Sequence, residues 1–336
     1  MRAAWSWLAA AGMASGWALA AALHERRTYY RGKTVLITGG SRGLGLALAR
    51  ELSAQGANLT LVARDPAELE AVRKELNCGS RCHTVIADAR KEEQIAYAVN
   101  AAVQQFGQLD ILINNAGMIS VAPFDNFTNQ DFEDALAIHL WAPLFAIRAA
   151  LPHFRAQGSG QIVNIASVGG KIGLPHLVPY CASKFALVGL SDALRTELRR
   201  ENIYVTTICP GLMRTGSHEH AIFKGDHRGE YRWFAISDAS PLLSTSVDSA
   251  ARQVLSATRK RLAYATVTLR ARLAIIGNEL FPELSTVTQA LVHNLIMPKA
   301  QPGGEKVYKA GYESHSRWAP SLLTRLADRE VPRMNQ

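Results

Sequence analysis

A short apolar strand, a glycine-rich turn and a helix follow one another early in the chain, and this succession constrains the fold most. Residues 34–38 are apolar and β-branched and predict a buried strand. After the turn, residues 46–52 predict a helix. Glycines let the backbone approach a pyrophosphate, and a helix N-terminus supplies free N–H groups. A purely structural turn is the alternative. The candidate dinucleotide contacts are Gly39, Ser41, Arg42, Gly43, Leu44 and Gly45.

Strands and helices continue to alternate after this unit. Apolar runs predict strands over residues 58–63, 84–88 and 109–117. Such alternation is typical of an α/β fold with a parallel, doubly wound sheet of the Rossmann type. With 336 residues, about half of them apolar, the chain is long enough for one large domain of this kind.

The residues that follow the second and third predicted strands bear on the cofactor. Arg64 comes directly after the second strand and can bind a 2′-phosphate, with Arg42 as a second cation on the same side. Both favour NADP(H) over NAD(H). If Asp65 instead turns toward the ribose and Arg64 toward solvent, NAD(H) is favoured. Asp88 ends the third strand, where an adenine edge is expected.

A tyrosine and a lysine are spaced four residues apart further along the chain. On a helix Tyr180 and Lys184 share one face. A free tyrosine has a pKa of about 10 and is a poor base at neutral pH, but a neighbouring ammonium favours the phenolate. Ser167, at the end of another apolar strand, could hydrogen-bond a substrate oxygen. The pair alone is a weak signal, and two unrelated surface residues are the alternative.

Taken together, these motifs resemble the short-chain dehydrogenase/reductase family over about residues 32–215, with a looser fit to residue 269. The order and spacing of several motifs fit, which is far more specific than any one of them. The matching residues are Thr38-Gly39-x-x-x-Gly43-x-Gly45, Asp88, Asn114-Asn115-Ala116-Gly117, Ser167, Tyr180-x-x-x-Lys184 and Pro210-Gly211.

The resemblance implies a role for each matched residue. Tyr180 would be the acid/base, Lys184 would lower its pKa and hold the nicotinamide ribose, and Ser167 would position the substrate carbonyl. The adenosine side of the cleft would be lined by Asn115, Ala116 and Gly117, and the nicotinamide carboxamide would be flanked by Pro210, Gly211 and Thr215.

One position departs from the family pattern. His139 stands where the family usually has an asparagine whose main-chain carbonyl helps hold a water in a proton relay to the lysine. The carbonyl is kept, and an imidazole could itself pass protons because it titrates near neutrality. A histidine that only packs against its helix remains the alternative.

The N-terminal residues predict a hydrophobic helix over 1–24. Residues 3–23 carry no charge and, as a helix, span the ~30 Å of a bilayer core. The basic residues at 24–27 favour an uncleaved anchor that leaves the following domain in the cytoplasm. A cleaved signal peptide and a soluble helix remain open, and with the latter a soluble cytoplasmic protein.

Beyond the catalytic domain, predicted over 32–269, the chain carries an extension. An apolar stripe over 270–298 predicts two helices that break at Pro282, which could cover the core, contact a subunit or lie on a membrane. Residues 299–336 are polar and predict a mobile tail. A lid over the substrate is expected from Met213, Phe223, Trp233 and Phe234.

Several classes of function are not expected. The net charge is +9, but no long basic run is interleaved with aromatics, so nucleic-acid binding is not predicted. The four cysteines lack metal-ligand spacing, and His218 and His220 lack a further ligand, so no metal site is predicted.

The sequence therefore predicts a membrane-associated oxidoreductase that transfers a hydride between NADP(H) and a carbonyl or secondary alcohol, with an apolar or lipid-like substrate and a homo-oligomeric state. The alternatives are a nucleotide-bound sensor or scaffold without turnover and an NAD-linked alcohol dehydrogenase.

Overall fold

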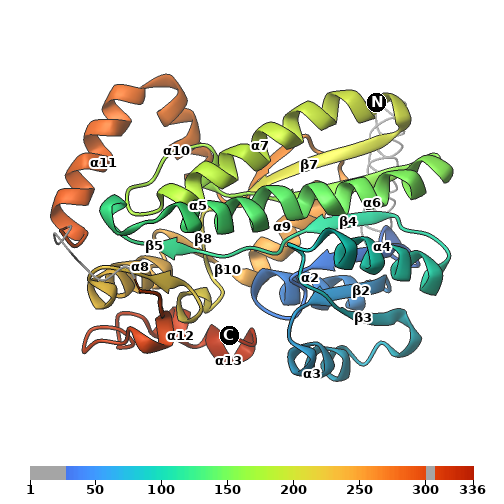
Figure 1. Cartoon of the computed structure of the whole chain (residues 1–336), viewed down its shortest axis with the longest axis horizontal. Coiled ribbons are helices and arrows are strands. Elements are labelled where there is room, and N and C mark those ends of the chain that lie inside the picture. The colour runs from blue at the N-terminus through green and yellow to red at the C-terminus, as the bar shows by residue number, and fades with distance from the viewer. Residues whose placement is uncertain (1–27, 300–306) are drawn as a thin grey trace, which may run out of the picture.

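The computed structural model describes residues 28–299 and 307–336 (Figure 1). The hydrophobic helix predicted over 1–24 lies outside these residues.

A seven-stranded parallel sheet forms the centre of the molecule and confirms the predicted α/β fold. Its strand order is β11-β7-β6-β4-β1-β2-β3. The strands are β1 (Thr34–Thr38), β2 (Asn58–Ala63), β3 (Cys82–Ile86), β4 (Ile111–Asn114), β6 (Gly160–Ile165), β7 (Ile203–Cys209) and β11 (Tyr264–Thr266). The direction of winding reverses between β1 and β4, which is where doubly wound sheets bind their ligands.

Helices cover both faces of this sheet. One core lies under α2 (Gly43–Ala54), α3 (Pro66–Leu76) and α9 (Val247–Arg259), and the other under α4 (Glu92–Phe106), α6 (Ala142–Ala156) and α7 (Val178–Leu198). Alternate residues of a strand enter opposite cores, so Val35 and Ile37 join the first and Leu36 the second. The continuous apolar strands follow from this double burial.

Within residues 28–299 and 307–336, one helical stretch has the length and composition of a membrane span. It runs over Asn129–Ala156 and comprises α5 (Asn129–Leu136), the π-helical turn η3 (Ala137–Trp141) and α6. In this structure α6 packs on α4, and α5 packs on α7, so the stretch is part of the domain.

A smaller layer covers the carboxyl ends of the strands. Its elements are β5 (Ser120–Val121), β8 (Leu212–Arg214), β9 (Ile222–Phe223), α8 (His227–Ala239), β10 (Ser244–Ser246) and β12 (Lys309–Ala310). Phe223 and Phe234, which we expected to contact substrate, are buried in this layer's own core beside Tyr231. Trp233 and Tyr180 pack against that core.

The predicted extension forms a helical hairpin of α10 (Leu269–Leu280) and α11 (Pro282–Ile296), which projects at one end of the molecule (Figure 1). The break at Pro282 is confirmed, with the proline in the first turn of α11. The apolar stripe does not cover the core, since α11 has no buried residue. The exposed apolar side chains include Leu273, Leu280, Leu284, Val287, Leu291 and Leu295.

The prediction of a mobile polar tail from 299 onward is corrected for residues 307–336. They pack on the domain through β12, α12 (Arg325–Asp328) and α13 (Glu330–Arg333). The contacts depend on widely separated buried residues, Ala319, Ala327 and Met334, which give no periodic signal in a polar sequence.

Candidate active site

The glycine turn has a geometry that only glycines allow at key positions. A Cβ on Gly45 would stand 2.0 Å from the carbonyl oxygen of Gly39, so a larger residue cannot fit there. Gly39 has a φ of +66°, in the left-handed region that favours glycine. Leu44 is buried and anchors the start of α2. Arg42 precedes that helix and makes no side-chain cap, and the Gly43 N–H donates instead to the carbonyl oxygen of Met334 at 3.0 Å.

The ends of β1 and β4 brace this turn. The Asn115 side chain donates to the carbonyl oxygens of Thr38 and Gly39 at 3.1 and 3.0 Å. The Thr38 hydroxyl accepts from the backbone N–H groups of Asn115 and Ala116. Asn115 therefore holds the glycine turn in place, and a Cβ on Gly117 would lie 3.1 Å from the His139 side chain.

The residues predicted to lie near the adenosine ribose differ in whether they already have a partner in the protein. Asp65 is the N-cap of α3 and accepts from the backbone N–H groups of Ala67 and Glu68, so its carboxylate is committed to that helix. Arg64 is exposed, and the described residues offer it no ion pair. Arg42 pairs with Glu68 at 3.5 Å, and Ser41 donates to the same carboxylate at 2.6 Å.

Asp88 follows β3 and residues 210–215 follow β7, on opposite sides of the reversal between β1 and β4 in the strand order. The Asp88 carboxylate is held by Arg90 in a close pair of hydrogen bonds, and this partner lowers its pKa. The Pro210 carbonyl accepts from the backbone N–H of Val168, the residue after Ser167. A Cβ on Gly211 would lie 4.0 Å from the Val168 side chain. Thr215, further along the same segment, is buried.

Ser167, Tyr180 and Lys184 come together at the carboxyl end of β6. Ser167 caps the short helix η4 (Val168–Gly170) by accepting from the Gly169 N–H at 3.0 Å, and its hydroxyl lies near enough to the Tyr180 phenol to lower the pKa of that group. Lys184 donates to the carbonyl oxygen of Ile165 at 2.8 Å, and its ammonium lies 5.7 Å from the centre of the Tyr180 ring. Lys184 is buried, and Ser167 and Tyr180 are half-buried beside it.

Burial dominates the electrostatics of this site. It raises the pKa of Tyr180 to about 12, against the lowering effect of the Ser167 hydroxyl. It also lowers the pKa of Lys184 to about 7. The sequence suggested that the ammonium would lower the pKa of the phenol. In the protein alone desolvation sets the direction and the Ser167 hydroxyl is the lowering contribution, so Tyr180 keeps its proton at neutral pH.

His139 is a buried link between two elements of the site. Its Nε2 accepts from the backbone N–H of Met118 at 3.2 Å, so Nδ1 carries the proton and donates to the Ser183 hydroxyl at 2.8 Å. Burial and then the Lys184 charge lower its pKa well below 6.5, which keeps the ring neutral. The residue sits on η3, a π-helical turn of the kind often found at functional sites.

Three features of the site were not predicted. Asn114 donates to Asn164, which donates to Ser191, both at 2.8 Å, and this buried chain ties β4 to β6 and α7. Lys224 and Asp131 form a buried ion pair at 2.7 Å. The C-terminal residues reach the glycine turn. Single polar residues in apolar surroundings were the only signal available, and they do not reveal their partners.

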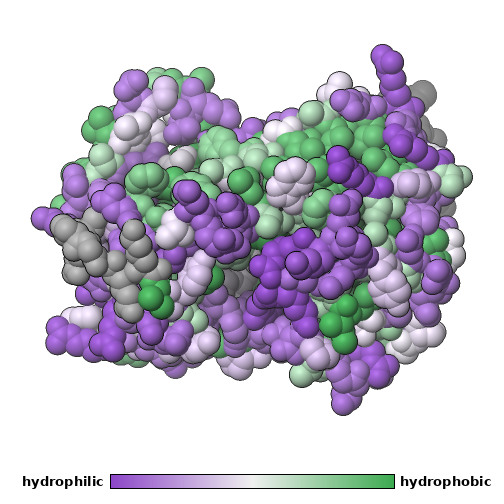
Figure 2. All heavy atoms as spheres, in the orientation of Figure 1, coloured by the Kyte–Doolittle hydropathy of each residue, from purple (hydrophilic) through white to green (hydrophobic). Residues whose placement is uncertain are grey.

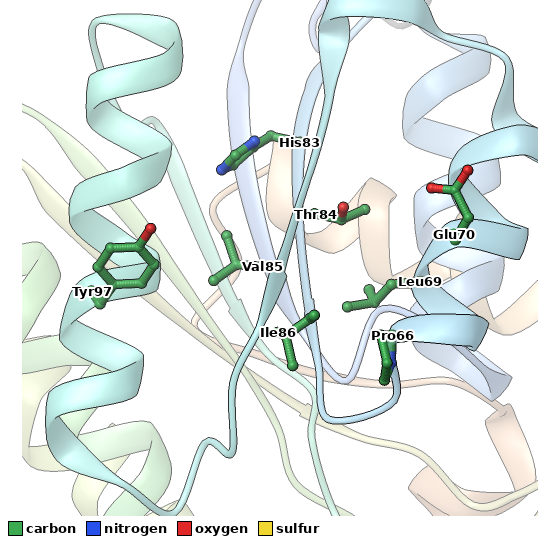
Figure 3. A pocket seen from close by; sticks show the side chains of 8 residues that line it. All are labelled: Pro66, Leu69, Glu70, His83, Thr84, Val85, Ile86 and Tyr97. Atoms are coloured by element: carbon green, nitrogen blue, oxygen red, sulfur yellow. The ribbon is translucent and has the colours of Figure 1, made fainter.

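A recess of about 300 Å³ lies elsewhere, at the outer edge of the sheet (Figure 3). Side chains from α3, β3 and α4 line it, and none belongs to the predicted site: Pro66, Leu69, Glu70, His83, Thr84, Val85, Ile86 and Tyr97. Within residues 28–299 and 307–336, no three histidine, cysteine or acidic side chains gather as metal ligands do.

Comparison with known proteins agrees with this geometry. Residues 33–222 match the family model for short chain dehydrogenase. The chain is 40% identical over 183 residues to the putative ketoacyl reductase 1 of granaticin polyketide synthase from Streptomyces violaceoruber, covering 54% of this chain and 67% of that protein. It is 35% identical over 187 residues to D-β-hydroxybutyrate dehydrogenase from Rhizobium meliloti, covering 54% of this chain and 72% of that protein.

Among solved structures, levodione reductase superposes with a TM-score of 0.62 at 30% identity, covering 70% of this chain and 95% of that one. The parallel sheet, the braced glycine turn and the sequence match all lead to the same family. The chain belongs to the short-chain dehydrogenases, and is an oxidoreductase of that family whose members use a nicotinamide cofactor.

Proposed function

We propose that the protein reduces a carbonyl group to a secondary alcohol with NADPH, or catalyses the reverse oxidation. The observation that carries this proposal is the convergence of the Ser167 hydroxyl, the Tyr180 phenol and the buried Lys184 ammonium at the carboxyl end of β6. A proton donor, a hydroxyl and a cation beside the cofactor cleft suit a substrate oxygen that gains charge and then a proton.

The residues would divide the work as follows. The bound cofactor supplies the hydride and so the redox chemistry. Tyr180 gives its proton to the substrate oxygen, a task for which a raised pKa is suited because the phenol stays protonated. Ser167 orients the same oxygen, and Lys184, with its lowered pKa, can return a proton to the phenol.

The residues around the ribose favour NADP(H). Because Asp65 caps α3, it is not available to select a 2′-hydroxyl, whereas Arg64 is exposed and unpaired among the described residues. Glu68 opposes this preference, since its carboxylate holds both Ser41 and Arg42. The preference for NADP(H) over NAD(H) would therefore depend on the balance between the Arg64 cation and the Glu68 carboxylate.

Two substitutions test the cofactor preference in opposite directions. Arg64→Asp should lower the ratio of NADPH to NADH affinity by roughly tenfold or more, because it removes a cation and adds a like charge to the phosphate. Glu68→Gln should raise the same ratio. Fluorescence titration of both cofactors measures it, and two unchanged ratios would place the 2′-phosphate elsewhere.

The substrate would be apolar or lipid-like. Tyr180 and Trp233 pack against the apolar core of the covering layer, so the surroundings of the reacting oxygen are apolar. The relatives include proteins named for a ketoacyl group and for hydroxybutyrate, both with an oxygen on an aliphatic chain. A long-chain ketone or 3-oxo lipid fits this chemistry better than a sugar.

A bilayer would be the second partner. Residues 3–23 carry no charge in the sequence, and α10 and α11 expose apolar side chains that would suit a membrane. This supports a membrane-associated protein with its catalytic domain in the cytoplasm.

Self-association would use another face. In Figure 2 hydrophobic side chains gather over α6 and α7, where Trp141 and Phe185 are exposed. Such a patch favours contact with a second copy. Light scattering of the purified protein tests this, and a monomer at micromolar concentration would exclude it.

A turnover screen tests the central proposal. NADPH consumption is followed with a panel of aliphatic ketones, 3-oxo esters and sugars, for the natural protein and for Tyr180→Phe. Turnover of an apolar ketone that disappears in the variant supports reduction. Cofactor binding without turnover of any carbonyl or alcohol would favour the alternative, a nucleotide-bound sensor or scaffold.

A further inference from the structure

The C-terminal residues 330–336 lie across the glycine turn and are firmly anchored there. The carbonyl oxygen of Met334 accepts from the backbone N–H of Gly43, the first residue of α2, at 3.0 Å. The Asn335 side chain donates to the carbonyl oxygen of Ser41 at 3.1 Å. The Met334 side chain is fully buried in the core formed by α2 and α9. The contact is thus built into the fold.

A second set of contacts carries the segment to the other flank of the cleft. Arg333 pairs with Asp248 on α9, and its carbonyl oxygen accepts from Arg50 on α2 at 2.8 Å. A Cβ on Gly216 would stand 2.8 Å from the Cα of Val331, so the two backbones are in close contact. The segment therefore bridges the glycine turn and the residues that follow Thr215.

Gln336 stands between these two flanks. Its Nε2 lies 2.9 Å from the point where a Cβ on Gly43 would be, and the Thr215 Cβ lies 4.0 Å from the same point. Among the described residues none hydrogen-bonds the Gln336 side-chain amide. An amide offers two donors, and phosphate oxygens accept strongly from such groups.

We propose that Gln336 is a further cofactor-binding residue, which donates from its side-chain amide to the pyrophosphate of the dinucleotide. Met334 and Asn335 are positioning residues that hold it beside Gly43. This inference rests on the dinucleotide binding put forward under the proposed function. The Gly43 N–H donates to the Met334 carbonyl oxygen, so it is not available to the pyrophosphate. The Gln336 amide supplies a donor in its place.

Binding measurements on the full chain test this assignment. Gln336→Ala should weaken NADPH roughly tenfold, the usual loss for one hydrogen bond to a charged group. Gln336→Glu should weaken it further through repulsion. Gln289→Glu on the distant helix α11 makes the same change of charge and serves as the control. Adenosine 2′-monophosphate, which has no pyrophosphate, should bind all four proteins equally.

Each outcome has a definite meaning. Weaker NADPH with unchanged 2′-monophosphate binding and an unchanged melting temperature supports the assignment. Unchanged or tighter NADPH binding in Gln336→Ala overturns it, as does an equal loss for both ligands. If the natural protein binds no dinucleotide, the proposed function itself fails, which is a different result.

Discussion

Tyr180 keeps its proton at neutral pH because burial raises its pKa to about 12, while Lys184, buried beside it, has a pKa lowered to about 7. A protonated phenol is ready to donate, and an amine that titrates near neutrality can restore its proton. Under the proposed function, the phenol would be protonated when the carbonyl substrate arrives, as reduction requires.

His139 acts on this pair only through packing and hydrogen bonds. Both of its ring nitrogens are engaged, and its pKa is held well below 6.5. His139→Asn should therefore retain activity within about tenfold, because an amide can also donate and accept. Steady-state kinetics across pH measure this. A loss as complete as that of Tyr180→Phe, or the disappearance of an acidic limb from the pH profile, would show that the imidazole transfers protons.

His218 makes stability depend on pH. Burial alone would lower its pKa, but the Asp238 carboxylate at 3.6 Å and the Asp328 carboxylate, hydrogen-bonded at 3.2 Å, outweigh it and raise the pKa to about 9. The folded state thus binds the extra proton between pH 6.5 and 9. The stabilisation is complete below pH 6.5 and is lost as the pH rises through 9.

Substitution at this residue should reproduce that dependence. His218→Gln should destabilise the protein by on the order of 2 kcal/mol more at pH 6 than at pH 10. Denaturant unfolding of the natural and variant proteins at both values measures the difference. The neighbouring, exposed His220 gives the control His220→Gln. An equal cost at both pH values would mean that the His218 cluster is not ionised in the folded protein.

At the scale of elements, the hairpin of α10 and α11 is the part of the fold with the least cover. Its apolar stripe has the spacing of a core-facing helix, yet Leu284 and Leu291 are exposed. Burying each leucine in lipid would contribute about 2 kcal/mol. The pair Leu284→Ser and Leu291→Ser should therefore reduce binding to vesicles by at least about tenfold.

Vesicle sedimentation measures this effect in a chain that lacks residues 1–24, so that the hairpin acts alone. Leu242→Ser changes an equally exposed leucine outside the hairpin and should leave binding unchanged. Equal binding by the double variant and the natural chain would show that the stripe serves another surface, such as a second copy.

At the scale of the whole molecule, the predictable parts are those encoded in neighbouring residues. The strand-turn-helix unit, the alternation of strands and helices and the break at Pro282 each follow from local periodicity or backbone restriction. The grouping of Ser167, Tyr180 and Lys184 followed from the family resemblance and the parallel order of the strands.

The parts that were missed depend on contacts between distant residues. Nothing in the polar C-terminal sequence indicates that Met334 enters the main core beside α2. Whether the apolar stripe on α11 is buried depends on where the hairpin lies relative to the domain. The spacing of the apolar residues along α11 does not determine this. The pKa of Tyr180 is raised by burial. The spacing of residues along a helix predicts which side chains are neighbours, but not how deeply they are buried.

The most direct test of Tyr180 as the proton donor separates cofactor binding from turnover in one variant. In Tyr180→Phe, titration with NADPH should give the affinity of the natural protein within a few fold, while turnover of the best carbonyl substrate falls by at least about a hundredfold, since only the proton donor is lost. Retention of turnover by this variant would contradict the assignment of Tyr180 as the acid and, with it, the proposed mechanism.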